Sequence, residues 1–292
     1  MTILHRLNEQ ILFTEVQHPD YLVRGAALLG GAATAIWDTL THPDDMQALL
    51  PLVGNRLPIV VYSHADWDHI WGTAAFPAAP QVVVGHRLCR RRFDDDVPAT
   101  LQRRKREEAG RWDAVRLVPP NRIFDDTLVL DLGGLTLELH SLPGHTPDSI
   151  VGLVVEHGLL LMGDAVETPL PCVPAGCPLN SWLAALGGWL ADSRVETVVP
   201  AHGPWGGKEI IEQTMTYLQG LQAGRRIPGI AALSPFYRRT HRETLGNCRA
   251  LGPALHAAPA NRPEYRNPAG KAIFRNDSRV KDHMPGSAAD CS

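Results

Sequence analysis

Residues 62–72 read YSHADWDHIWG and place four metal-ligating residue types within six positions: His64, Asp66, Asp68 and His69. The apolar run PIVV directly before this stretch predicts a buried strand that leads into it. Alternate residues of extended backbone point the same way, so His64 and Asp66 can face one cation. Asp68 and His69, at the start of the following turn or helix, can face another. Four such side chains would repel or desolvate one another badly without cations, so the stretch indicates a metal site.

Three further stretches place a metal-ligating residue type at the end of an apolar run. PGHTPDS presents His145 in a tight turn after a predicted strand, LLLMGDA ends its run on Asp164, and VVPAHGP leads into His202. A buried carboxylate such as Asp164 is costly unless a metal ion or hydrogen bonds compensate it. Each feature alone is weak, but together with the cluster at 64–69 they predict a metal centre built from several strand ends.

The rest of the chain alternates strand-like and helix-like stretches. Runs rich in β-branched and aromatic residues predict strands at 11–16, 21–29, 33–40, 58–64, 81–86, 127–132, 135–142, 149–164 (a hairpin turning at 157–158) and 197–200. Helices are predicted at 44–52, 180–192, 206–224 and in parts of the charged segment 90–111, with a break near Pro98. We therefore expect one large hydrolase domain over residues 1–252, followed by a loosely ordered Pro/Ala/Gly-rich tail at 253–292.

The composition and the amino terminus indicate which partners and which cellular compartment to expect. The chain of 292 residues carries 28 basic and 31 acidic side chains, a net charge of -3, so neither nucleic acid nor an anionic membrane is expected to bind it. The amino terminus is polar where a secretion signal needs an apolar core, which favours the cytoplasm. Five cysteines without a CxxC pair indicate neither a disulfide framework nor a thiolate zinc site. We expect a small-molecule substrate, and a monomer or a homodimer.

The metal-ligating residue types follow one another as Asp38, the cluster at 64–69, His145, Asp164 and His202. This order resembles that of the metallo-β-lactamase superfamily over roughly residues 10 to 225. The resemblance implies an α/β (α+β) fold, a four-layer αββα sandwich with a dinuclear site at one edge of its two sheets. It implies that metal 1 is bound by His64, Asp66 and His145, and metal 2 by Asp68, His69 and His202. It further implies that Asp164 bridges the two metals, and that Asp38 orients a ligand or the loop from behind.

Asp66 departs from the usual pattern of this family, which reads His-x-His-x-Asp-His and has histidine at that position. A carboxylate there adds negative charge and a hard oxygen donor. We expect two zinc ions per chain, and manganese or iron become more plausible than in relatives with the usual motif. Two alternatives stay open: metal 1 is only partly occupied and the protein works with one metal, or Asp66 is not a ligand.

The same resemblance implies a hydrolase that uses a metal-bound hydroxide. Paired cations lower the pKa of a water between them and polarise the bond under attack, so no side-chain nucleophile is needed. Asp68 would be catalytic as well as a ligand, because a carboxylate beside that water can hold its remaining proton. The branch similar to hydroxyacylglutathione hydrolase favours a small thioester, a lactone or another ester. GxSxG, P-loop and Rossmann glycine patterns are absent from the sequence.

Other functions remain open from the sequence. A phosphodiesterase or a β-lactamase-type amidohydrolase would use the same residues, and Asp66 keeps open a weakly active, metal-binding regulatory protein. Oxygen or nitric-oxide chemistry at two irons would need a redox partner domain, and no flavin-binding segment is visible.

Substrate-binding residues are not identified individually, but segments 87–112 and 169–180 are expected to shape the substrate site. Trp67 and Trp71 are expected to pack rather than to stack on a substrate. Residues 235–245 predict a helix surface in preference to a position at the mouth of the site.

Overall fold

The computed structural model describes residues 2–53, 58–76, 82–250 and 273–274. The predicted tail at 253–292 lies outside these residues, except for the two-residue strand β13 (Ile273–Phe274), which pairs with the second sheet. Among the described helices, none combines the length and the apolar character that crossing a bilayer requires.

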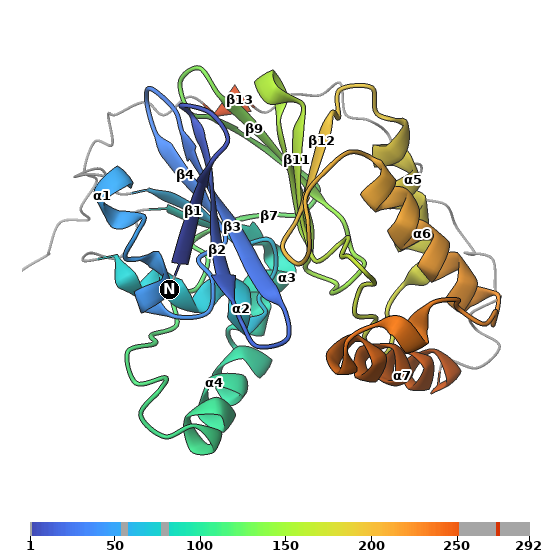
Figure 1. Ribbon diagram of the computed structural model, residues 1–292. Coiled ribbons are helices and arrows are strands. Elements are labelled where there is room, and N and C mark those ends of the chain that lie inside the picture. The colour runs from blue at the N-terminus through green and yellow to red at the C-terminus, as the bar shows by residue number, and fades with distance from the viewer. Residues whose placement is uncertain (1, 54–57, 77–81, 251–272, 275–292) are drawn as a thin grey trace, which may run out of the picture.

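Two β-sheets form the centre of the molecule (Figure 1). The first sheet has seven strands in the order β1 (Thr2–Arg6), β2 (Ile11–Gln17), β3 (Leu22–Leu29), β4 (Thr34–Trp37), β5 (Ile59–Val61), β6 (Val82–His86) and β7 (Arg122–Phe124). The second has six, in the order β12 (Thr197–Pro200), β11 (Leu159–Gly163), β10 (Ile150–Val154), β9 (Thr136–Ser141), β8 (Thr127–Asp131) and β13.

Apolar side chains on both faces of each sheet create the layers. In β2, Ile11 and Phe13 pack between the sheets, whereas Leu12 and Val16 pack on the opposite face against the helices of the first half. This alternation follows from the two-residue period of a strand. Helices α5 (Leu179–Ala191) and α6 (Glu209–Gln222) cover the outer face of the second sheet, and α7 (Pro235–Ala250) packs against the same apolar cluster beyond the strand ends (Figure 1). The predicted αββα sandwich is therefore confirmed.

The helices of the first half differ in detail from the sequence prediction. The stretch 44–52 does not form one helix: a 3₁₀ turn at Pro43–Met46 is followed by α1 (Leu50–Val53). The charged segment forms α3 (Arg87–Arg92) and α4 (Asp96–Glu107), so the break comes before Pro98. Pro98 lies in the first turn of α4, where a missing backbone N–H removes no helical hydrogen bond.

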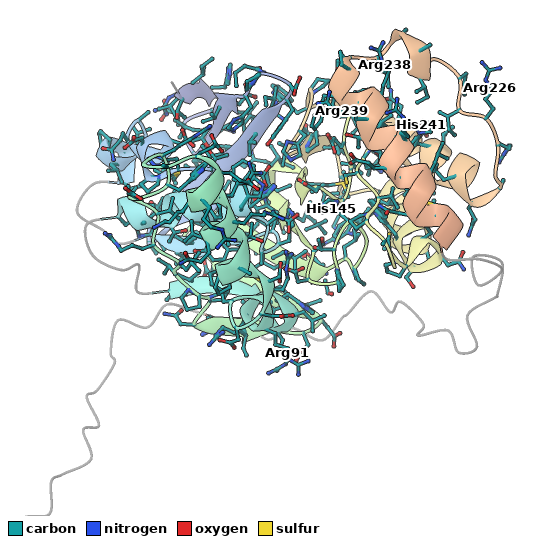
Figure 2. All side chains as sticks on the ribbon, turned by 90° about the horizontal axis from the view of Figure 1, so that it is seen from below. Arg91, His145, Arg226, Arg238, Arg239 and His241 are labelled. Atoms are coloured by element: carbon teal, nitrogen blue, oxygen red, sulfur yellow. The ribbon has the colours of Figure 1, made fainter. Side chains whose placement is uncertain are left out.

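The topology brings the strand ends of both sheets together. Strands β4, β5 and β6 are parallel neighbours in the first sheet, and β11 and β12 are parallel neighbours in the second. Parallel neighbours end at the same edge, which is where α/β proteins place ligand-binding residues. A hydrogen bond of 2.8 Å from Ile150 N to Ser63 O joins the two sheets at this edge. Figure 2 shows His145 in the middle of the molecule and Arg91 at its periphery.

Candidate metal centre

All of the predicted ligand residues meet at this edge. Side-chain donor atoms lie within 4.8 Å of one another in three groups: His64, Asp66 and His145; Asp68, His69 and His202; and His64, His69 and Asp164. The short helix α2 (Trp67–Ile70) begins within the cluster and carries Asp68 and His69. The His69 ring stays next to that of His64, with ring centroids 4.1 Å apart. The first two groups are those that the family resemblance implies for metal 1 and metal 2.

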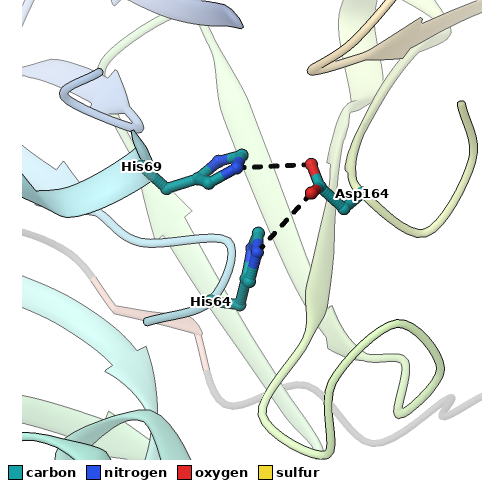
Figure 3. Close-up of side chains that lie close together, drawn as sticks. All are labelled: His64, His69 and Asp164. Atoms are coloured by element: carbon teal, nitrogen blue, oxygen red, sulfur yellow. Dashed lines mark ion pairs between the residues drawn. The ribbon is translucent and has the colours of Figure 1, made fainter. Parts of the chain in front are cut away.

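Asp164 lies between these two groups. Its Oδ1 atom is 3.3 Å from both His69 Nε2 and His202 Nε2. Its Oδ2 atom is 3.8 Å from His64 Nε2 and 3.6 Å from His145 Nε2. Figure 3 shows the carboxylate with His64 and His69 on its two oxygens. One carboxylate thus offers a separate oxygen to each group, as a ligand that bridges through both of its oxygens does.

The four imidazoles are oriented through their other ring nitrogen. The Nδ1 atoms lie within hydrogen-bond distance of the Ser63 hydroxyl (His64, 2.9 Å), the Asp38 carboxylate (His69, 2.9 Å), the Cys172 carbonyl (His145, 3.1 Å) and the Leu22 carbonyl (His202, 2.7 Å). A carbonyl or carboxylate can only accept, so Nδ1 carries the proton wherever it meets one. This leaves Nε2 of those rings as the atom able to bind a cation, and Nε2 is the atom that faces the centre.

Several buried atoms of the centre lack hydrogen-bond partners among the described residues. They are His64 Nε2, His69 Nε2 and Asp164 Oδ1. His64 and His69 are 1% and 0% exposed, so bulk water does not satisfy these atoms. Leaving buried polar atoms unpaired is costly, and a divalent cation between imidazole nitrogens and carboxylate oxygens would remove that cost. The donor set of imidazoles and carboxylates therefore fits zinc, manganese or iron.

The imidazoles and carboxylates shift one another's pKa values. Burial would lower the pKa of His145 and of His202, but hydrogen bonds and charges of the facing carboxylates raise these values to about 9 and about 10. Burial would raise the pKa of Asp66 and of Asp164, yet the neighbouring imidazoles hold both well below the usual range. Cation binding at this centre therefore has to displace protons from histidine.

Asp38 supports the centre from beneath. It is fully buried, and its Oδ1 accepts a hydrogen bond of 2.7 Å from Ser63 N. Its Oδ2 accepts from His69 Nδ1 at 2.9 Å and from the Ser63 hydroxyl at 2.7 Å. The φ angle of Asp38 is 55°, a left-handed conformation that aspartate and asparagine tolerate better than most residues. Asp38 thus orients His69, the role expected from the sequence.

Asp66 has a cationic partner that the sequence analysis missed. The Arg92 guanidinium, at the end of α3, lies 2.7 Å from Asp66 Oδ1 and also pairs with Asp96 and Asp148. Arg92 stands in a run of three arginines, and nothing in the charge pattern distinguishes it from Arg90 and Arg91.

Two further buried polar contacts near the centre were not predicted. Arg24, 3% exposed, donates to the carbonyls of Pro200 and Gly203 at 2.7 and 2.8 Å, on either side of His202. Its position in an apolar strand was the available signal, because a buried arginine needs partners. The Tyr237 hydroxyl donates to the Glu167 carboxylate at 3.1 Å, and burial raises the pKa of Glu167 to about 7.

The expectations for the surrounding residues have mixed outcomes. Trp71 is 1% exposed and packs against Trp112, so the packing interpretation is confirmed for it. Trp67 is covered by the Arg104 guanidinium at 4.2 Å. On α7, Arg238 and His241 bond to Ala231 O and Tyr217 respectively, on the helix surface as expected (Figure 2). Tyr237 instead points inward.

A comparison with protein families identifies the chain. Residues 13–202, well over half of the 292, match the family described as the metallo-beta-lactamase superfamily. The chain belongs to this superfamily. As a member, it is a hydrolase of the metallo-beta-lactamase superfamily, whose proteins bind divalent metals, usually zinc.

Individual relatives agree with this membership. A hydroxyacylglutathione hydrolase of Anaeromyxobacter dehalogenans (strain 2CP-C) is 32% identical over 140 residues, which cover 48% of this chain and 44% of the relative. The match therefore spans less than half of that protein's length. A metallo-beta-lactamase from Pontibacter korlensis aligns with a TM-score of 0.59 and 20% identity, over 75% of this chain and 99% of the other. The mono-zinc form of the metallo-beta-lactamase FIM-1 from Pseudomonas aeruginosa aligns with a TM-score of 0.55 and 20% identity, over 75% of this chain and 95% of the other. The two structures support the superfamily fold.

Proposed function

We propose that this superfamily member hydrolyses a small thioester or ester with two divalent cations, zinc in the first place. The cations would be held by His64, Asp66, His145, Asp68, His69 and His202, with Asp164 between them. The observation that carries the proposal is Asp164, whose two oxygens face opposite pairs of imidazole Nε2 atoms at 3.3 to 3.8 Å. A carboxylate that bound only one cation would not need imidazole nitrogens around both of its oxygens.

The chain's own residues would accept a proton during the reaction and hold the histidine rings in place. Bound divalent cations would supply a Lewis acid and lower the pKa of a water molecule at the centre. Asp68 is 8% exposed, and its two oxygens lie 3.8 Å from His69 Nε2 and 3.9 Å from His202 Nε2. We assign it the acceptance of a proton from that water during attack. The hydrogen bonds on Nδ1 of the four histidines would keep their rings fixed throughout.

The choice of a thioester or ester rests on similarity and on the surroundings of the centre. The relative named hydroxyacylglutathione hydrolase is 32% identical over part of its length. A pocket of about 180 Å³ opens beside Asp66, and five of its lining residues come from the predicted substrate segment 87–112: Arg92, Asp96, Val97, Thr100 and Arg103. A pocket of this size suits one small group of a substrate rather than a polymer.

The test combines metal content with substrate choice on one sample. The full chain, purified without chelators, would be analysed for metals and assayed against thioesters, lactones, phosphodiesters and a chromogenic cephalosporin. We expect about two equivalents of divalent metal and hydrolysis of one ester or thioester class that a chelator abolishes and added zinc restores. His241→Gln, on the surface of α7, is the matched control for His145→Gln and should keep both properties.

Other outcomes would redirect or overturn the proposal. Chelator-sensitive hydrolysis of a phosphodiester or of the cephalosporin, without ester hydrolysis, would replace the substrate class and retain the metal centre. Two bound metals without turnover of any compound would favour a regulatory metal-binding protein. No bound metal after reconstitution would overturn the proposed function.

A further inference from the structure

The carboxylate of Asp66 is divided between two environments. Its Oδ2 atom faces the centre, 3.6 Å from His64 Nε2 and 3.4 Å from His145 Nε2. Its Oδ1 atom faces away and lies 2.7 Å from Arg92 Nη2. Only one oxygen of this carboxylate is therefore available to a cation, although the residue has two.

Arg92 is itself held from other sides. Its Nε and Nη2 atoms donate to Asp96 at 3.0 and 2.8 Å, and its Nη1 donates to Asp148 Oδ1 at 3.2 Å. Asp148 is fully buried, and its second oxygen accepts from Ala65 N at 2.8 Å, next to Asp66 in the chain. A guanidinium is a planar fork of five N–H groups, so carboxylates on several sides fix both its place and its orientation.

We propose that Arg92 is a positioning residue. It makes Asp66 bind a cation through one donor atom, as the histidine at this position of the usual motif would. With one oxygen committed to Arg92, the carboxylate presents a single donor atom, as an imidazole does, and part of its negative charge is compensated. The Arg92–Asp66 pair thereby keeps the first cation site selective for zinc over hard, oxygen-preferring cations such as manganese. This inference rests on the proposed function, since it concerns one of the two metal sites proposed there.

The selectivity follows from how cations choose ligands. Zinc favours few ligands and accepts imidazole nitrogen, whereas harder cations favour more oxygen donors and more negative charge. A carboxylate free of Arg92 could rotate and offer both oxygens, together with its full charge. Asp66, Asp68 and Asp164 bring three carboxylates to the centre, one more than a histidine at position 66 would leave. Arg92 offsets part of the charge of the extra one, because it shares its single positive charge among Asp66, Asp96 and Asp148.

The test measures metal selectivity rather than turnover. Metal-free full-length protein would be titrated with Zn²⁺ against a chromophoric chelator, and with Mn²⁺ followed by electron paramagnetic resonance. The quantity compared is the ratio of the Mn²⁺ and Zn²⁺ dissociation constants at the weaker-binding site. We expect Arg92→Gln to reduce this preference for zinc about tenfold or more, the size typical of residues that orient metal ligands. Arg90→Gln, which loses only a surface pair of 2.8 Å with Asp94, is the matched control and should keep the ratio.

Two further variants separate selectivity from general damage. Arg92→Lys keeps a positive charge beside Asp96 and Asp148 but cannot span three carboxylates, so we expect a smaller shift in the same direction. In an Asp66→His background, Arg92→Gln should leave the ratio unchanged, because no carboxylate remains at that position to be released.

The outcomes distinguish this inference from the proposed function. Wild-type protein that binds neither metal would overturn the proposed function and this inference with it. Wild-type protein that binds two zinc ions, with an unchanged ratio in both Arg92→Gln and Arg92→Lys, would overturn this inference alone. An equal shift of the ratio with and without Asp66 would also overturn it, because the effect would then not pass through Asp66.

Discussion

Replacing Asp38 with asparagine should switch the proton of His69 from one ring nitrogen to the other. Asp38 accepts three hydrogen bonds, from Ser63 N, the Ser63 hydroxyl and His69 Nδ1, at 2.7, 2.7 and 2.9 Å. An asparagine oxygen can still accept from Ser63 N, but its amide NH₂ then faces His69 Nδ1. Two donors cannot face each other, so Nδ1 must give up its proton, and Nε2 must carry it. A protonated Nε2 cannot bind a cation.

The expected loss is confined to metal binding. Asparagine tolerates the left-handed backbone at position 38 as well as aspartate does and has nearly the same size, so the fold should persist. Loss of such an orienting partner typically weakens metal affinity about 10- to 100-fold, or roughly 1.4 to 2.7 kcal/mol. The assay is zinc titration of the metal-free protein against a competing chelator, with near-ultraviolet circular dichroism to monitor folding.

A surface variant provides the control for this experiment. Asp125→Asn removes an exposed carboxylate that pairs with Arg87 at 2.7 Å. It is the same exchange of aspartate for asparagine, at a residue that is not part of the metal centre. It should bind zinc like the wild type. Asp38→Asn protein that is folded and binds both zinc ions with wild-type affinity would refute the proposed orientation of His69.

Three further predictions concern pH and the supports of the centre. Because facing carboxylates raise the pKa of His145 from 6.5 to about 9 and of His202 from 6.5 to about 10, protonated imidazoles stabilise the metal-free fold; this contribution declines as pH rises above 6.5 and is lost as pH passes through 9 to 10. Zinc affinity should rise over the same interval, since zinc needs the deprotonated rings; an affinity that stays constant from pH 7 to 9 in calorimetric titrations would contradict this. Arg24→Met should lower the free energy of unfolding in urea by about 3 kcal/mol and weaken zinc binding, because it removes the hydrogen bonds on either side of His202. Unchanged stability would show that those bonds do not matter. Gly163→Ala should cost about 1 to 2 kcal/mol, because Gly163 has a φ of 51° and an added Cβ would lie 2.9 Å from Ser63; an unfolding curve that overlays the wild type would be the contrary result.

The larger features of the fold could be predicted because they depend on local patterns. Strands β2, β3, β9, β10 and β11 are apolar or alternating runs bounded by turn residues. The edge strands β1 and β7 were not predicted, since Thr2–Arg6 is polar on most positions and Arg122–Phe124 has only three residues. The break near Pro98 was predicted, but its place at residues 93–95 was not, because the charge pattern does not show where a loop separates two short helices.

The candidate site was predictable only as far as each residue follows a strand. His145, Asp164 and His202 could be recognised because each follows an apolar run. The cluster at 64–69 could be recognised because it has four metal-ligating residue types within six positions. The partners of these residues come from distant segments, so their roles depend on tertiary structure. Arg91 and Arg92 are neighbours in one charged run, yet Figure 2 shows Arg91 at the periphery, while Arg92 reaches Asp66.

The central claim is that seven side chains of this hydrolase hold two separate cations with Asp164 between them. Anomalous diffraction from zinc-loaded crystals, recorded on both sides of the zinc absorption edge, tests it most directly. We expect two zinc peaks: one between His64, His145 and Asp66, the other between His69, His202 and Asp68, with one Asp164 oxygen next to each. A single peak, or two peaks of which neither contacts Asp66, would contradict it.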